Sequence, residues 1–343
     1  MSLWSFPPRN EAPCRAPGPT PGSRRGLNFR RARRSASLLL LFLPLCVPAA
    51  PNQVRVQLQK LEINNQTHLA YRKYTSPTPR GVVLYLHGVQ SHSGWYRMSG
   101  KMLAERGYTV YAPDRRGTGL NERDRGHLQN YEDLIADLDA FMARIHADYP
   151  DLPVYLLGVS WGGKLALLYE TMRPGQVNGL ILSTPGISAK VDLSLWNKLK
   201  VFYYSWRRRE VQPEIPIPID RASLFTDDPK WQNWIEQDPQ TLRKATARFY
   251  WESRKMDKAV RRGTKKAEAP VLLLLAGRDE IVNNEKINRF LTRKLPGSET
   301  DRYQVIEYPS ARHTLEFEKN LKAVVGDMVR WMDLWNSGAA KPE

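Results

Sequence analysis

Cysteine is almost absent from this chain of 343 residues. The two cysteines, Cys14 and Cys46, both lie in the N-terminal segment, residues 1–50. The rest of the chain therefore has no disulfide, no thiol nucleophile and no cysteine metal site. Covalent catalysis, if the chain performs it, must use another nucleophile.

A long apolar run is also lacking. The apolar stretch at residues 38–47 is too short to span a bilayer comfortably. It follows a basic block and precedes Ala49 and Ala50, an order that is typical of a secretory signal peptide. The sequence therefore predicts export to a periplasmic, secreted or membrane-associated location, with a mature start near Ala50 or Pro51. Two alternatives stay open: an uncleaved N-terminal anchor and a disordered basic tail.

Acidic side chains are fewer than basic ones: 35 Asp and Glu stand against 52 Lys and Arg, a formal net charge of +17. Such an excess suggests a polyanionic partner. Residues 1–50, however, hold eight arginines and one glutamate and so contribute +7 of it. The other basic residues are not organised on a recognised nucleic-acid-binding module, so the sequence predicts no nucleic-acid partner.

After the leader, the hydrophobic pattern changes from alternating to continuous. Residues 54–74 alternate around the turn INNQT, which predicts an antiparallel hairpin. Five continuous apolar runs follow, as expected for strands covered on both faces, at residues 81–88, 108–114, 153–160, 179–185 and 270–280. Helical patterns separate them near residues 96–106, 131–148, 161–173, 283–295 and 318–335. This alternation predicts an α/β fold, with a doubly wound, mostly parallel sheet.

The alternation is interrupted between residues 188 and 268, where no strand–helix unit can be found. We interpret this stretch as an inserted helical cap. The predicted organisation is a leader at residues 1–50, a core in two parts at residues 51–187 and 269–338, and the cap at residues 188–268.

Ser160 lies in the motif GVSWGG, directly after a buried run and at the start of a helical pattern. A serine hydroxyl becomes a good nucleophile only when a base removes its proton, and a sharp strand-to-helix turn projects it from the sheet. Glycines are needed on either side because side chains there would collide with the crowded backbone. The motif in this context predicts a nucleophilic serine.

The partners of such a serine follow it along the chain, first an acid and then a histidine. Of the six histidines, only His313 follows Ser160. Asp279 lies near the carboxyl end of the run 270–280, just past its apolar residues, at the sheet edge where sites of α/β proteins form. The predicted catalytic residues are therefore Ser160, Asp279 and His313, with Glu280 and Asp192 as rivals for the acid.

A developing oxyanion needs fixed donors, and backbone N–H groups supply them. Trp161, which follows the nucleophile, provides one, and Val89, in the loop after the first buried run, provides the other. His87 in that loop is interpreted as a structural hydrogen-bonding residue. This chemistry requires no metal or cofactor.

Several motifs together resemble the α/β-hydrolase superfamily, and within it the monoacylglycerol lipase and lysophospholipase group, also called serine-aminopeptidase-like (S33-type) hydrolases. The resemblance covers roughly residues 65–335 and depends on the segments HGVQSHSGWY, APDRRGTG, RGH, GVSWGG, AGRDEIV and ARHTLEFE. It implies the same catalytic triad and oxyanion donors. It also implies that Trp95, which replaces the usual arginine, borders the acyl-binding space together with Trp161.

The cap carries aromatic residues among basic ones in the segment LSLWNKLKVFYYSWRRR. Trp196 and Phe202 are predicted to contact substrate, and the segment to make peripheral contact with a membrane. The alternative is that these aromatic residues pack as the core of the cap.

These features predict a serine hydrolase of lipid metabolism, which cleaves carboxylic esters such as a monoacylglycerol or a lysophospholipid through an acyl-enzyme on Ser160. An esterase, a lactonase or an aminopeptidase of the same fold remains open, as does a non-catalytic lipid-binding protein. Neither the oligomeric state nor the acyl length follows from the sequence.

Overall fold

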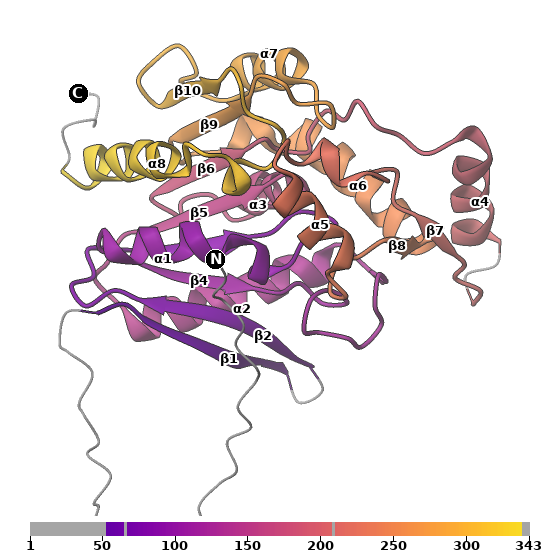
Figure 1. The fold of residues 1–343 in the computed structure, drawn as a ribbon, viewed down its shortest axis with the longest axis horizontal. Coiled ribbons are helices and arrows are strands. Elements are labelled where there is room, and N and C mark those ends of the chain that lie inside the picture. The colour runs from indigo at the N-terminus through magenta and orange to yellow at the C-terminus, as the bar shows by residue number, and fades with distance from the viewer. Residues whose placement is uncertain (1–52, 65–66, 208–209, 338–343) are drawn as a thin grey trace, which may run out of the picture. The chain divides into compact units, whose positions relative to one another are not determined.

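The computed structural model describes residues 53–64, 67–207 and 210–337 (Figure 1). The predicted signal segment and both cysteines lie outside these residues. The centre of the described part is an eight-stranded sheet with the strand order β1-β2-β4-β3-β5-β6-β9-β10. Its strands are β1 (Arg55–Asn64), β2 (Thr67–Thr75), β3 (Gly81–Leu86), β4 (Tyr108–Pro113), β5 (Val154–Val159), β6 (Gly179–Ser183), β9 (Val271–Ala276) and β10 (Tyr303–Tyr308).

Strand direction follows the hydrophobic pattern of the sequence. β1 and β2 form an antiparallel hairpin, and β2 pairs antiparallel with β4. From β4 to β10 all pairs are parallel. β3, β4, β5, β6 and β9 are buried at every residue, because helices cover both faces of a parallel sheet.

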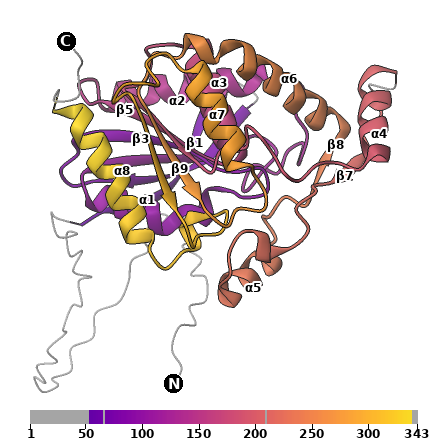
Figure 2. The same ribbon diagram turned by 90° about the horizontal axis from the view of Figure 1, so that it is seen from above.

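Helices cover the two faces of the sheet (Figure 2). α1 (Arg97–Glu105) and α8 (Leu321–Asn336) contact each other on one face. α2 (Glu132–Asp148), α3 (Trp161–Met172) and α7 (Asn284–Lys294) lie on the other. The predicted strands and helices match these elements to within four residues at each end. The predicted fold class, a doubly wound and mostly parallel α/β sheet, is confirmed.

The segment predicted to be a cap, residues 188–268, contributes no strand to the eight-stranded sheet. It extends beyond the side of the sheet where β5 and β9 end (Figure 1). A two-stranded antiparallel sheet joins its helices, which the sequence did not predict. The elements are α4 (Leu195–Trp206), β7 (Glu214–Pro216), η2 (Ala222–Leu224), α5 (Pro229–Gln237), β8 (Lys244–Thr246), α6 (Ala247–Gly263) and η3 (Thr264–Lys266).

Two short 3-10 helices complete the described chain, η1 (Ser93–Tyr96) before α1 and η4 (Leu315–Phe317) before α8. Among the described residues, no helix has the length and apolar character needed to cross a membrane.

Candidate active site

Ser160 lies at the sharp turn between β5 and α3. Its φ of 54° and ψ of −121° fall in a region that residues other than glycine rarely adopt. Backbone strain of this kind costs on the order of 1–3 kcal/mol and persists only where the surrounding structure enforces it. Two hydrogen bonds do so here: Ser160 N–H donates to the Ser183 carbonyl at 3.0 Å, and Gly186 N–H donates to the Ser160 carbonyl at 2.7 Å.

The glycines around Ser160 are required by close backbone contacts. A Cβ at Gly158 would lie 2.4 Å from the Gly162 carbonyl oxygen. A Cβ at Gly162 would lie 2.4 Å from the Leu86 carbonyl oxygen at the end of β3. The crowding inferred from the motif is therefore present, and it fixes the turn that carries Ser160.

Asp279 and His313, which are 34 residues apart in the sequence, form a hydrogen bond. His313 Nδ1 lies 2.7 Å from Asp279 Oδ2, and both side chains are buried. The other carboxylate oxygen, Oδ1, accepts the N–H groups of Ile281 at 2.8 Å and Val282 at 2.9 Å. Asp279 is thus held in one orientation from both sides, and so is the imidazole that it binds.

These contacts determine the charge of Asp279. Burial by itself would raise the pKa of this carboxyl. The charge and hydrogen bond of His313, together with the two backbone N–H groups, outweigh burial and hold the pKa below its ordinary value. Asp279 is therefore a carboxylate over the neutral pH range. On the opposite edge of the ring, His313 Nε2 is buried and has no hydrogen-bond partner among the described residues.

Two backbone N–H groups beside Ser160 are available as donors. The hydrogen bonds of the described residues include none from the N–H of Trp161 or of Val89. Val89 and Trp161 line the same cavity as Ser160. A Cβ at Gly88 would lie 3.4 Å from Ser160 Cβ, so the loop after β3 passes directly beside the serine.

His87 and Arg115 hold this loop in place. His87 Nε2 accepts the Arg115 N–H at 3.0 Å, and burial followed by the charge of Arg115 lowers the pKa of His87 well below its ordinary value. Nη2 of Arg115 donates to the carbonyl oxygens of Gly88 and Val89 at 3.1 and 3.0 Å. Burial lowers the pKa of Arg115 to about 9. His87 is thus a structural residue, and the supporting role of Arg115 was missed by sequence reasoning.

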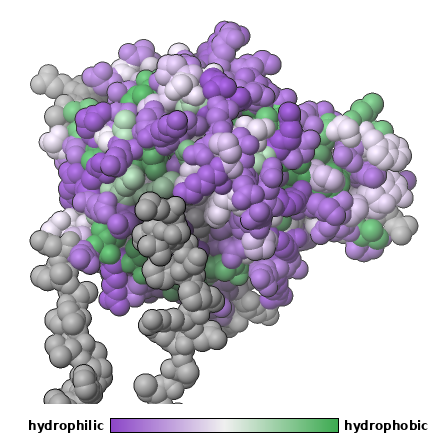
Figure 3. All heavy atoms as spheres, viewed as in Figure 1, coloured by the Kyte–Doolittle hydropathy of each residue, from purple (hydrophilic) through white to green (hydrophobic). Residues whose placement is uncertain are grey.

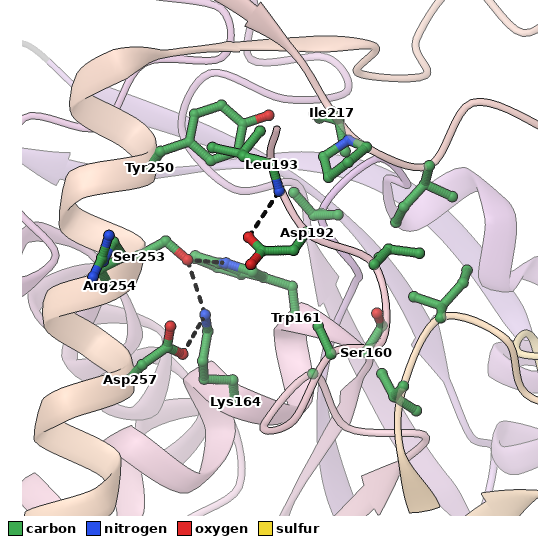
Figure 4. A pocket seen from close by; sticks show the side chains of 18 of the residues that line it. Ser160, Trp161, Lys164, Asp192, Leu193, Ile217, Tyr250, Ser253, Arg254 and Asp257 are labelled. Atoms are coloured by element: carbon green, nitrogen blue, oxygen red, sulfur yellow. Dashed lines mark hydrogen bonds and ion pairs between the residues drawn. The ribbon is translucent and has the colours of Figure 1, made fainter. Parts of the chain in front are cut away.

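A cavity of about 570 Å³ opens beside Ser160 (Figure 4). Its wall combines the core residues Ser160 and Trp161 with residues of the cap segment. Most of the wall next to Ser160 is apolar, and its aliphatic members are Val89, Ile187, Ala189, Val191, Leu193, Val201, Ile217, Ile219, Ile281 and Val282. A cavity of this size and character can hold an apolar chain next to the serine.

A polar cluster on the wall was also missed by sequence reasoning. Lys164, on the first turn of α3, is buried, and its Nζ donates to Ser253 Oγ at 2.9 Å and to Asp257 Oδ1 at 2.8 Å. Trp161 Nε1 donates to the same Ser253 oxygen at 3.0 Å (Figure 4). The Trp161 ring stacks on Phe249, with ring centroids 5.6 Å apart.

Trp95 lies away from the cavity. Its ring is buried and lies edge-on to Phe225, with Phe317 also in ring contact. Its Nε1 donates to Asp238 Oδ2 at 3.0 Å. Trp95 therefore packs the cap segment against the core, and its predicted place beside the substrate is not supported by this geometry.

Trp196 and Phe202 are also absent from the wall of the cavity. Both project from α4 and are exposed, Trp196 by 66% and Phe202 by 53%. Phe202 lines a separate groove between α4 and α6. The structure thus brings together Ser160, Trp161 and Val89, and pairs Asp279 with His313, but it places the three predicted substrate contacts elsewhere.

Within the described ranges no cluster of three or more His, Cys, Asp and Glu side chains could hold a metal ion.

The strained serine after β5, the Asp–His pair at the same edge of the sheet and the inserted segment define an α/β-hydrolase. A comparison with family models gives the same result: residues 77–320 match the hydrolase family described as serine aminopeptidase, S33. The chain belongs to this family.

Several characterised proteins are similar to the chain. The monoacylglycerol lipase of Mycolicibacterium smegmatis is 27% identical over 268 residues, which cover 77% of this chain and 92% of that protein. The human monoglyceride lipase is 27% identical over 282 residues, covering 80% of this chain and 89% of the relative. The phospholipase YtpA of Bacillus subtilis is 30% identical over 219 residues, or 61% of this chain and 80% of the relative.

Solved structures share the fold. The monoacylglycerol lipase of Paleococcus ferrophilus superposes with a TM-score of 0.68 at 22% identity and covers 79% of this chain and 99% of its own. A soluble variant of the Saccharomyces cerevisiae monoglyceride lipase, in complex with a substrate analogue, superposes with a TM-score of 0.70 at 21% identity. The match covers 84% of this chain and 98% of the yeast chain.

Proposed function

We propose that the chain is a serine hydrolase that cleaves carboxylic esters of lipid-like alcohols through an acyl-enzyme on Ser160. The observation that carries the proposal is the strained backbone of Ser160, at 54° in φ, on the wall of a cavity that also has many aliphatic side chains. Strain at a single polar residue beside a cavity is typical of a functional site.

The first half of the reaction forms the acyl-enzyme. Ser160 Oγ attacks the ester carbonyl while His313 Nε2, which has no partner among the described residues, takes the hydroxyl proton. The Asp279 carboxylate stabilises the imidazolium through the 2.7 Å hydrogen bond to Nδ1. The free N–H groups of Val89 and Trp161 stabilise the oxyanion.

The second half regenerates the serine. His313 returns its proton to the departing alcohol oxygen when the ester C–O bond breaks. It then takes a proton from water, whose oxygen attacks the acyl carbon. The carboxylic acid leaves, and the proton returns to Ser160 Oγ. No metal or cofactor enters these steps.

A lipid-like substrate is supported by the wall of the cavity and by the relatives. Aliphatic side chains next to Ser160 suit an acyl chain. Relatives that cover most of this chain are named monoacylglycerol lipase and monoglyceride lipase, and a further relative is named a phospholipase. An esterase, a lactonase or an aminopeptidase on the same fold, and a lipid-binding protein without activity, are the alternatives that the experiment must separate.

We also propose that α4 contacts a membrane surface. Six large apolar side chains are exposed on this one helix: Leu195, Trp196, Leu199, Phe202, Tyr203 and Trp206 (Figure 3). Lys198 and Lys200 lie among them, so α4 suits the boundary between acyl chains and anionic headgroups.

For residues 1–50 we propose export with removal of the leader. N-terminal sequencing of the mature protein is expected to begin near Ala50 or Pro51. An intact Met1 in the exported protein would rule out cleavage.

The experiment compares an ester and an amide with the same acyl group, p-nitrophenyl butyrate and butyryl p-nitroanilide. We expect the ester to be hydrolysed faster, and Ser160→Ala to lower kcat by about 10⁴-fold or more with an unchanged circular dichroism spectrum. Ser298→Ala, a change at a half-buried serine outside the wall of the cavity, is the control. Full activity of Ser160→Ala would refute the proposal, and faster amide cleavage would favour an amide hydrolase of the same fold.

A further inference from the structure

The cavity beside Ser160 has a charged end as well as an apolar one. Four basic side chains and two acidic ones lie on its wall: Lys164, Lys198, Arg254, Arg261, Asp192 and Asp257. The proposed hydrolysis of an ester at Ser160 uses none of them. These charged side chains are therefore available to bind another group of the substrate.

The two acidic residues are already paired. Asp257 forms an ion pair with Lys164 at 2.8 Å, and Asp192 forms one with Lys198. Arg254 and Arg261 are exposed residues of α6 that line this cavity, and their side chains form no hydrogen bond or ion pair with any described residue. The wall thus carries two positive charges that no acidic group in the described part of the chain balances.

Both arginines lie on the same side of α6. They are seven residues apart, or about two helical turns, which separates their Cα atoms by about 10 Å. Ser253 and Asp257, from the same helix, reach toward Lys164 of α3 (Figure 4). Arg254 and Arg261 thus line the same cavity as Lys164, on the α6 side of its wall.

This cationic end is close to the reacting serine. Lys164 follows Ser160 by four residues on α3, a rise of about 6 Å along the helix. Lys164 is only 4% exposed, and its charge is balanced by the ion pair with Asp257, so the unbalanced charge of this wall belongs to the two arginines. A short spacer such as glycerol can therefore join a scissile ester at Ser160 to an anion held at this end.

We propose that Arg254 and Arg261 bind the phosphate group of the substrate. The substrates of this site would then be anionic lysophospholipids in preference to neutral monoacylglycerols. The inference rests on the proposed ester hydrolysis at Ser160. A phosphate monoester, as in an acylglycerol phosphate, carries about −1.5 to −2 charges at neutral pH, which matches the two unbalanced arginines. The planar guanidinium of arginine also pairs with phosphate oxygens through two parallel hydrogen bonds.

The first test compares monododecanoyl glycerol with its phosphate ester below the micellar concentration of both. We expect the wild type to have the higher kcat/KM for the phosphate ester. Arg254→Gln and Arg261→Gln are each expected to lower the ratio of the two kcat/KM values by about tenfold, as the loss of a charge-assisted hydrogen bond predicts. Arg262→Gln, on the same helix but away from the cavity, is the control and should leave the ratio unchanged.

The second test measures binding and separates a lipid headgroup from free phosphate. Dodecyl phosphate, dodecanol and inorganic phosphate compete with p-nitrophenyl butyrate. We expect dodecyl phosphate to inhibit at least tenfold more strongly than dodecanol, and Arg254→Gln with Arg261→Gln to abolish the difference. Inorganic phosphate should not inhibit at the same concentrations. Inhibition by inorganic phosphate alone would assign the site to the free anion and overturn the lipid proposal.

The two proposals fail in different ways. Equal kcat/KM values for both lipids, unaffected by the arginine substitutions, would overturn the anion site and leave ester hydrolysis intact. If the wild type hydrolysed none of the esters and Ser160 did not react with a fluorophosphonate, the proposed function itself would be refuted.

Discussion

At the scale of single residues, the orientation of the imidazole depends on Asp279. Three hydrogen bonds hold this carboxylate, one from His313 and two from backbone N–H groups. Because Oδ2 accepts from Nδ1, the ring must carry its proton on Nδ1 and leave Nε2 free to act as a base. An amide in place of the carboxylate would lose the charge that stabilises the imidazolium.

Asp279→Asn is therefore expected to lower kcat for p-nitrophenyl butyrate by about 10³- to 10⁴-fold, with a much smaller effect on KM. Glu280→Gln is the matched control, since this neighbouring carboxylate is half exposed and pairs with Arg312. Steady-state kinetics at neutral pH measure both variants. A larger loss of activity in Glu280→Gln than in Asp279→Asn would transfer the acid role to Glu280.

The required order of residue types led the sequence to predict Ser160, Asp279 and His313, since only one histidine follows the serine. The structure pairs Asp279 with His313, as that prediction requires. The Lys164 cluster was not predictable, because its partners Ser253 and Asp257 lie about ninety residues away in a segment with no recognisable motif. Trp95 was placed beside the substrate by resemblance. Its actual neighbours, Phe225 and Phe317 among them, come from distant segments whose position no local pattern reveals.

At the scale of elements, η4 connects the loop of His313 to helix α1. Glu316 Oε1 accepts the N–H groups of Met98 at 2.9 Å and Ser99 at 3.1 Å, in the first turn of α1. The carboxyl is buried next to Tyr85 and Tyr96 and forms no ion pair with a basic side chain in the described part of the chain. Burial raises the pKa of Glu316 to about 8, although the hydrogen bonds from Ser99 and Met98 act in the opposite direction.

Stability is therefore expected to fall as the pH rises from the ordinary glutamate pKa of 4.5 to about 8. In this window the unfolded chain releases the proton of Glu316 while the folded chain keeps it, so the folded state is favoured most at low pH. Glu316 contributes at most about 1.4 kcal/mol per pH unit to the fall in the free energy of unfolding. Urea denaturation at several pH values in this window measures that free energy.

Glu316→Gln should remove this contribution, because the amide does not titrate. Glu307→Gln, at an exposed glutamate of β10, is the control and should keep the wild-type slope. A Glu316→Gln profile parallel to that of the wild type would show that this carboxyl does not hold its proton in the folded state.

Long elements were predictable from the sequence, and very short ones were not. The continuous apolar runs of β3, β5 and β9 and the helical patterns of α2 and α3 gave nearly correct bounds, because each contains several periods of its pattern. β7 and β8 have three residues each, too few to show alternation, and they pair across almost thirty residues. The small sheet of the cap segment was missed for this reason.

At the scale of the whole molecule, exposed apolar side chains gather on α4 (Figure 3). The sequence left two alternatives for these aromatic residues, the core of the cap or a surface. Only Val201 and Ser205 of this helix are buried, so most of its aromatic residues are on the surface. A cluster of this kind is typical of an interaction site.

The double substitution Trp196→Ser with Phe202→Ser is expected to weaken binding to vesicles of phosphatidylglycerol and phosphatidylcholine at least about tenfold, since each side chain loses its apolar burial. Sedimentation with vesicles measures the bound fraction. Val56→Ser with Leu58→Ser removes two exposed apolar side chains from β1 and is the matched control. Equal losses in the two double variants would show that binding is not specific to α4.

The arrangement of the sheet was predictable as a whole, because alternating strands and helices admit few arrangements once crossovers are right-handed. The position of the cap segment relative to His313 could not be predicted from the sequence. It depends on contacts between distant residues, such as that of Phe225 with His313, whose ring centroids are 6.1 Å apart. The wall of the cavity, on which the proposed substrate depends, therefore had to come from the structure.

The most direct test of the account is the reaction of Ser160 with a fluorophosphonate, followed by mass spectrometry of the intact protein and of its peptides. An activated serine should take up one phosphonate group on the peptide that contains Ser160, with no adduct on Ser160→Ala or on the heat-denatured chain. An unmodified native protein, or an adduct confined to another residue, would contradict the assignment of Ser160 as the nucleophile.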